Sequence, residues 1–130
     1  MDLVSNVLST IKNSSMSGKK FVEVPYSKMV EQVIKILKAE EFIEAYNVFK
    51  PEGEHFKMIH VDIKYEGGVG RISQIKKISK PGRRVYKGTA KMREIMNGFG
   101  LSVVSTSRGI MSGRDARKKR LGGEVICEVY

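Results

Sequence analysis

The chain has 130 residues, of which 41% are apolar, and a formal net charge of +10. This length predicts one domain or two small ones, and the apolar content excludes a chain that is disordered throughout. No apolar run approaches the roughly 20 residues that span a bilayer, residues 1–13 lack the basic flank of a secretory signal, and the single cysteine excludes an internal disulfide, so a cytoplasmic protein is expected.

The first half of the chain predicts an α-β-α-β-β unit. Apolar residues recur at helical spacing in residues 2–14 and again in residues 29–37, where Ser27 is the expected N-cap. The expected strands are residues 19–25, 42–49 and 56–66. Pro51 and Gly53 predict a hairpin turn between the last two strands.

Three glycines within residues 66–70 mark the expected boundary between a first domain, residues 1–66, and a second, residues 67–130. The expected strands of the second domain are residues 71–79, 83–88, 101–107 and the alternating 124–130. Residues 89–99 predict its one main helix, residues 108–111 are expected to turn out of the third strand, and Ser112 with Asp115 resembles a capping box. The sequence therefore predicts an α+β protein of two small, tightly packed domains, the second mostly β.

Charge is distributed unevenly between the two halves. Residues 1–65 contain nine lysines and nine acidic residues, whereas residues 66–130 contain seven lysines, eight arginines and five acidic residues, which gives 15 − 5 = +10. The forked guanidinium group suits phosphates and base edges. This asymmetry favours a polyanion bound by the second domain over the alternative of a merely solvated basic surface.

The first binding motif is Ser105-Thr106-Ser107-Arg108-Gly109, at the end of a predicted strand. Hydroxyl groups can donate to phosphates and accept from bases, and short side chains allow a close approach of the backbone. From the residues alone, an ordinary polar turn at the end of a buried strand is as good an interpretation as a binding loop.

The second motif surrounds the predicted Lys80-Pro81-Gly82 turn. Its cations are Lys80, Arg83, Arg84 and Lys87, and Tyr86 supplies a ring that can stack on a base. We favour binding over a solvated edge hairpin. The basic run at residues 114–120 is typical of unspecific phosphate contacts or of a solvated helix, and its order without RNA is left open.

Signals for an enzyme are weak. His55 and His60 have no partner at metal-ligand spacing, and Cys127 alternates with apolar residues as a small buried side chain does. Residues 67–71 lack the Gly-Lys-Ser/Thr ending of a phosphate-binding loop. We expect no cofactor and no metal. A small RNA-directed enzyme using Cys127, His60 and the hydroxyl cluster remains the alternative.

Three segments carry a family resemblance: VVSTSRGIM (103–111), ISKPGRRVYKG (78–88) and GGEVICEVY (122–130). Together they resemble the universal family of small-subunit ribosomal protein eight, and the resemblance covers essentially the whole chain in order. Residues 2–13, DLVSNVLSTIKN, look more like the archaeal and eukaryotic branch than the bacterial one.

The resemblance implies two small associated domains, of which the second grips an irregular helix in the central domain of the small-subunit rRNA. Residues 105–109 would reach a minor groove and an exposed adenine, while Tyr86 and its neighbouring cations would brace the backbone. Glu124 would orient the loop. A second rRNA segment would touch Thr10, Lys12 and Asn13.

The role implied by the resemblance is a non-catalytic rRNA binder that supports assembly of the small subunit. Such a protein is expected to be a monomer when free, to lie in the cytoplasmic ribosome beside other small-subunit proteins, and to bind no membrane. A regulator that binds its own mRNA through the same loop is a further alternative.

Overall fold

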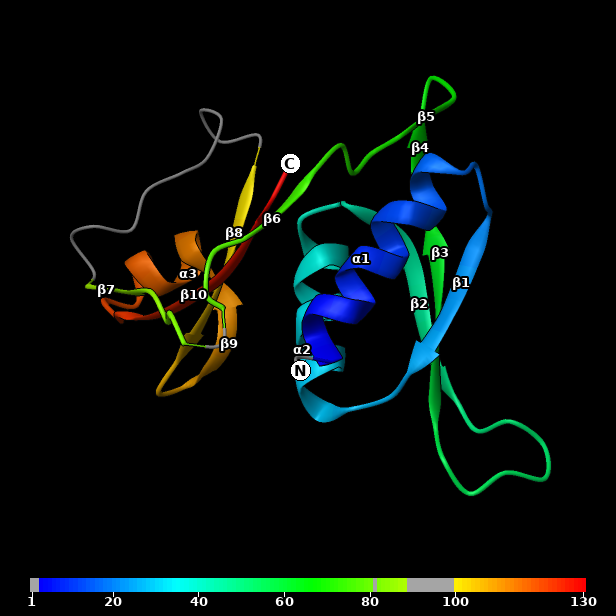
Figure 1. Cartoon of the computed structure of the whole chain (residues 1–130), viewed down its shortest axis with the longest axis horizontal. Coiled ribbons are helices and arrows are strands. Elements are labelled where there is room, and N and C mark those ends of the chain that lie inside the picture. The colour runs from blue at the N-terminus through cyan, green and yellow to red at the C-terminus, as the bar shows by residue number, and fades with distance from the viewer. Residues whose placement is uncertain (1–2, 81, 89–99) are drawn as a thin grey trace. The chain divides into compact units, whose positions relative to one another are not determined.

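The computed structural model describes residues 3–80, 82–88 and 100–130. The chain is an α+β protein, as predicted, and it divides after Ser73 into two compact units. We call them the N-terminal unit and the C-terminal unit (Figure 1). The helix predicted for residues 89–99 lies outside the described residues. Within the described ranges, no helix is long and apolar enough to cross a membrane.

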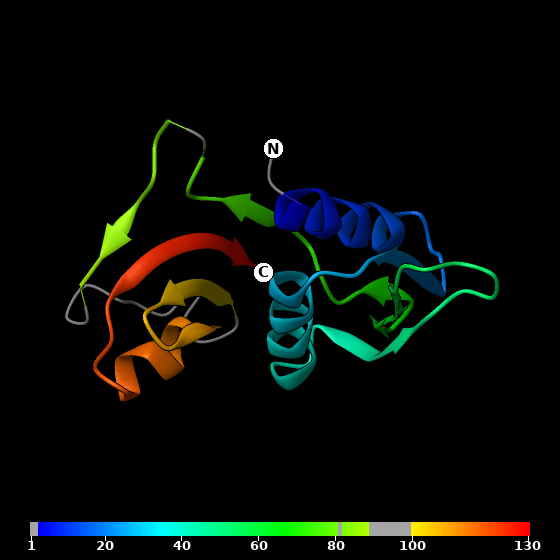
Figure 2. The same cartoon turned by 90° about the horizontal axis from the view of Figure 1, so that it is seen from below.

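The N-terminal unit packs two helices on one face of a three-stranded antiparallel sheet (Figures 1 and 2). The helices are α1 (Leu3–Met16) and α2 (Lys28–Ala39), and the strands, in the order β1-β3-β2, are β1 (Phe21–Pro25), β2 (Ile43–Phe49) and β3 (Met58–Ile63). Alternation along β3 buries Ile59, Val61 and Ile63 against the helices. The expected cap is confirmed, because the Ser27 hydroxyl accepts from the Val30 amide at 3.1 Å.

The segment after the glycine-rich turn stays with the N-terminal unit. Strands β4 (Tyr65–Glu66) and β5 (Val69–Gly70) form a short hairpin, and Ile72 beyond it is buried. The Arg71 guanidinium lies 4.0 Å from the centroid of the Phe42 ring, a cation–π contact within the same unit. The division after Ser73 therefore falls later than the boundary expected after residue 66, because these contacts tie the intervening residues to the first sheet.

The C-terminal unit contains an antiparallel sheet in which β10 (Gly123–Val129) pairs with three other strands. The other elements are β6 (Ile75–Lys77), β7 (Tyr86–Lys87), β8 (Leu101–Thr106), β9 (Gly109–Ser112) and α3 (Gly113–Lys118). The strand order is β6-β10-β8-β9, and β7 also pairs with β10. The expected cap of α3 is confirmed, because the Ser112 hydroxyl accepts from the Asp115 amide at 3.1 Å.

Three expectations for this unit were wrong in detail. Residues 109–112 form strand β9, so Arg108-Gly109 does not lead away from the sheet but into a second strand. The strands predicted at 71–79 and 83–88 shrink to three and two residues. The register between β8 and β10 shifts between Val125 and Cys127, and this bulge interrupts the simple alternation expected for residues 124–130.

Candidate RNA interface

The start of β10 brings the two predicted binding motifs together. Gly123 pairs with Thr106 of β8 on one side and with Lys87 of β7 on the other. The next position of β10 repeats this arrangement with Glu124, Ser105 and Tyr86. Two segments that lie some distance apart in the sequence therefore flank the same two residues of β10, one on each side.

Two glycines make this close arrangement possible. A Cβ atom at Gly123 would lie 2.2 Å from the Ser105 carbonyl oxygen, and one at Gly122 would lie 2.8 Å from the Lys87 carbonyl oxygen. Both obstructing atoms belong to backbone, which cannot rotate away as a side chain can. In the sequence, Gly122 and Gly123 follow the basic run at residues 114–120. Their position directly before an apolar strand was the available signal for a close approach of backbones.

The residues of the Ser105–Gly109 segment differ in what they leave exposed. The Thr106 hydroxyl accepts from the Arg108 amide at 3.1 Å and donates to the Gly109 carbonyl at 2.8 Å, so it holds the turn. Gly109 has a φ of 112°, a value that favours glycine. Ser107 and Arg108 are exposed at the tip of the β8–β9 hairpin, and Ser105 is half-buried. Ser107 and Arg108 are thus the exposed side chains of this segment.

The basic segment, which we define as Lys80, Arg83, Arg84 and Lys87 with Tyr86, presents a cationic and aromatic surface. The backbones of Lys80 and Arg83 exchange two hydrogen bonds of 2.9 Å. Arg83 and Arg84 are exposed, and the Tyr86 side chain is 69% exposed. The ring is therefore accessible for stacking on a base or a ribose.

Glu124 contacts the basic segment through its side chain. Its carboxylate accepts from the Arg84 guanidinium at 3.5 Å. The Arg84 side chain is half exposed, so solvent screens the pair, and it contributes at most about 1 kcal/mol to stability. The ion pair therefore matters for position, because it holds the Arg84 guanidinium beside the start of β10.

The remaining predicted contact residues belong to the N-terminal unit. Thr10 and Asn13 are exposed on α1, and Lys12 is half-buried. The Thr10 hydroxyl donates to the Asn6 carbonyl at 2.8 Å. These three residues lie on α1 and belong to the other unit from the motifs that pair with β10.

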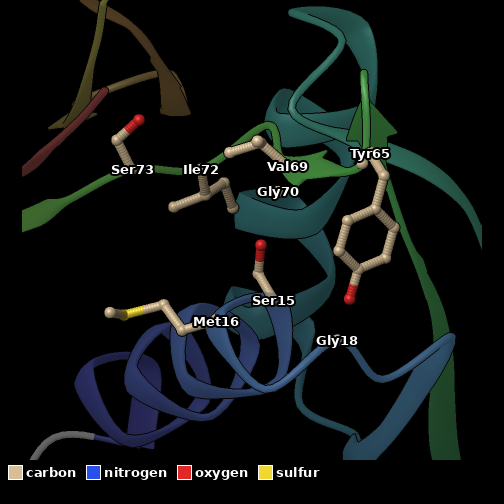
Figure 3. A pocket seen from close by; sticks show the side chains of 9 residues that line it. Ser15, Met16, Gly18, Tyr65, Val69, Gly70, Ile72 and Ser73 are labelled. Carbon is tan, nitrogen blue, oxygen red and sulfur yellow. The ribbon is translucent and has the colours of Figure 1, made fainter.

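A hollow in the N-terminal unit lies between the end of α1 and the β4–β5 hairpin (Figure 3). The Ser15 hydroxyl faces Gly70, where a Cβ atom would lie 1.9 Å from the oxygen. The Tyr65 hydroxyl donates to the Lys19 carbonyl at 2.5 Å. The lining residues Met16 and Val69 are largely exposed, and none of the lining residues is charged. The hollow therefore offers no cationic side chain to a phosphate backbone.

His60 and Cys127, the two residues of the enzyme alternative, both make contacts that serve the fold. On the open face of the first sheet, the His60 ring stacks on Phe21 with centroids 4.6 Å apart and contacts Glu23 at 2.9 Å and Asp62 at 3.1 Å. The pKa of His60 is raised, chiefly by the hydrogen bond to Glu23, and burial opposes this rise while Asp62 adds to it. Cys127 is buried within β10, out of reach of a substrate. Within the described ranges, no group of three or more acidic, histidine or cysteine side chains is arranged to hold a metal ion.

Comparison with known proteins gives full-length matches. The family model described as ribosomal protein S8 matches residues 2–130. The small ribosomal subunit protein uS8 of Mesoplasma florum is 43% identical over 129 residues, which cover 99% of this chain and 98% of that protein. The proteins of the same name from Campylobacter hominis and Paracoccus denitrificans are 43% and 40% identical, each over 99% of this chain and at least 97% of the relative. These relatives come from bacteria, so the archaeal or eukaryotic branch expected from residues 2–13 gains no support.

Proposed function

The chain belongs to the ribosomal protein S8 family, and from this premise we propose that it is an rRNA-binding structural component of the small ribosomal subunit. It clamps an irregular helix in the central domain of the rRNA and so supports assembly of the subunit, without catalysis. It is a monomer when free, and its neighbours in the cytoplasmic ribosome are the rRNA and other small-subunit proteins. Binding to its own mRNA would use the same surface.

The observation that carries this proposal is the pairing of both motifs with the start of β10. Ser105 and Thr106 flank Gly123-Glu124 on one side, and Tyr86 and Lys87 flank them on the other. The exposed turn at Ser107-Arg108 directly follows the first pair, and Tyr86 in the second pair is exposed. The turn offers a hydroxyl group and a guanidinium group for a bulged base, while the basic segment offers cations for the adjoining phosphates. An irregular A-form helix presents both targets close together, because its readable bases lie where the helix is distorted.

The test is a binding titration of the purified chain over a series of salt concentrations. One RNA is a short hairpin that copies the irregular central-domain helix, and the other is a duplex of the same length and scrambled sequence. Tight binding is expected for the hairpin alone, with log Kd rising against log salt by about 0.7–0.9 for each phosphate contacted.

Two variants test which kind of RNA contact the Ser107-Arg108 turn makes. Ser107→Ala is expected to weaken hairpin binding at every salt concentration with an unchanged slope, because it removes a contact to a base or sugar. Arg108→Ala lowers the slope by about one phosphate contact if its guanidinium binds the backbone. Equal affinity of the native chain for both RNAs, unaffected by either substitution, would overturn the proposal and leave only a general electrostatic surface.

A further inference from the structure

A buried serine lies at the base of the basic segment. Ser79 is only 7% exposed, and its hydroxyl donates to the Val125 carbonyl at 2.7 Å and accepts from the Val85 amide at 3.0 Å. In the opposite direction, the Val125 amide donates directly to the Val85 carbonyl at 2.9 Å. A regular antiparallel pair would exchange two direct bonds. Here one of the two bonds passes through the Ser79 hydroxyl.

The hydrogen bonds of Ser79 lie between two stretches of chain that pair with β10, namely β6 before Ser79 and β7 after it. Before it, β6 pairs with residues 127–129 of β10, and the amides of Ile78 and Ser79 both donate to the Ile126 carbonyl at 3.1 and 3.3 Å. After it, Tyr86 and Lys87 pair with residues 123 and 124. The cations of Lys80, Arg83 and Arg84 come between these two paired stretches. The Ser79 hydroxyl therefore joins the two ends of the segment that carries these cations, and it attaches them to β10.

We infer that Ser79 is a positioning residue of the RNA interface, which fixes the basic segment against β10 without touching RNA itself. The inference rests on the proposed function. Val125 is buried, so loss of the hydroxyl leaves its carbonyl and the Val85 amide without their partner in a place that water does not reach freely. The basic segment is then no longer held against β10, and its cations no longer keep one fixed position for binding phosphates.

The first experiment follows the free protein. In Ser79→Ala, hydrogen exchange at the Val85 amide is expected to rise at least tenfold, while exchange at the Ile34 amide in the N-terminal unit keeps its native rate. The matched control is Ser27→Ala, which removes another hydroxyl-to-amide bond, in the other unit. Native protection of Val85 in Ser79→Ala would overturn the inference, and this arm needs no RNA.

The second experiment measures affinity for the hairpin RNA over the salt series. Ser79→Ala is expected to lower the slope by about the amount lost in the double variant Arg83→Ala/Arg84→Ala, and to lower it no further when combined with that variant. Ser27→Ala, which only destabilises, keeps the native slope. A native slope in Ser79→Ala, or full additivity with the two arginine substitutions, would overturn the inference.

Two further outcomes are distinguishable. If the native chain does not prefer the hairpin, the proposed function fails, and with it the RNA part of this inference, whatever the exchange data show. If Ser79→Ala does not fold, Ser79→Cys replaces it in both arms, since a thiol of similar size is only a weak donor and acceptor. Ser79→Thr keeps the hydroxyl and is expected to restore the native slope.

Discussion

The β2–β3 hairpin of the N-terminal unit and the β8–β9 hairpin of the C-terminal unit differ in what their residues do. In the N-terminal unit, β2 and β3 pair from Ile43 to Phe49, buried residues alternate along β3, and the loop between the strands, residues 50–57, contains none of the residues expected to bind RNA. In the C-terminal unit, β8 and β9 turn through Ser107-Arg108 alone, and a threonine hydroxyl holds that turn. The first hairpin serves the core, and the second presents a surface.

The contrast extends to what fixes each unit. The N-terminal unit depends on apolar contacts between helices and sheet, which tolerate small shifts of backbone. The edge of the C-terminal unit depends on glycine contacts and on the hydroxyl groups of Ser79 and Thr106, which do not. Substitutions should therefore separate into those that lower stability with binding intact and those that also remove binding.

The largest expected effect on stability belongs to the first core. Ile34 on α2 is fully buried, so Ile34→Ala should lower the free energy of unfolding by about 2–5 kcal/mol, through lost burial and a residual cavity. Urea unfolding checks this, with Met29→Ala on the exposed side of the same helix as the control. RNA affinity measured where the variant is still folded should be unchanged. A loss of affinity at full folding would erase the contrast between the units.

Gly123→Ala tests the close approach at the other unit. Its methyl group would meet the Ser105 carbonyl oxygen, and the strands must separate, which destabilises the protein by about 1–3 kcal/mol. Hairpin binding should fall as well, because both motifs pair with this residue. Gly88→Ala is the control, since no atom lies within 4 Å of its added Cβ. Native binding by a folded Gly123→Ala protein would show that the spacing of the motifs is unimportant.

Thr106→Val removes the hydroxyl of the β8–β9 turn and keeps the size of the side chain. The loss of two hydrogen bonds should lower stability by roughly 1–2 kcal/mol and weaken hairpin binding, because Ser107 and Arg108 lose their fixed position. Ser107→Ala is the complementary variant, expected to weaken binding at native stability. Thermal melts and titrations of the two variants distinguish support of the turn from contact with RNA.

The smallest effect concerns His60 in the N-terminal unit. Its pKa is raised in the folded protein, chiefly by Glu23, so its contribution to stability is fully present below the unfolded pKa of about 6.5. That contribution is lost as the pH rises through the folded pKa. It should stay under about 1 kcal/mol, since the two carboxylates are more than 40% exposed. Urea unfolding between pH 5 and 8 should show this loss in the native chain and in His55→Asn, but not in His60→Asn.

Much of the fold was predictable because its signals are local. The apolar spacing of Val7, Leu8 and Ile11 specifies a helix, and the side chains of Ser27 and Ser112 cap the residues that directly follow them. The division into two units needed more than the glycine-rich turn, because Arg71 and Ile72 are held by contacts with residues far earlier in the chain.

The sequence by itself determined the α+β class, the basic second half and the two motifs expected to bind RNA, because periodicity, motifs and the distribution of charge along the chain can be read without knowing its fold. Only the tertiary structure decided that both motifs flank Gly123-Glu124, that Thr106 holds the turn while Ser107 is exposed, and that Ser79 replaces a direct bond between strands. The physical reason is that a hydroxyl group satisfies whichever backbone group the fold brings near it. Those partners are fixed by strand register, and for Ser79 one of them is 46 residues away.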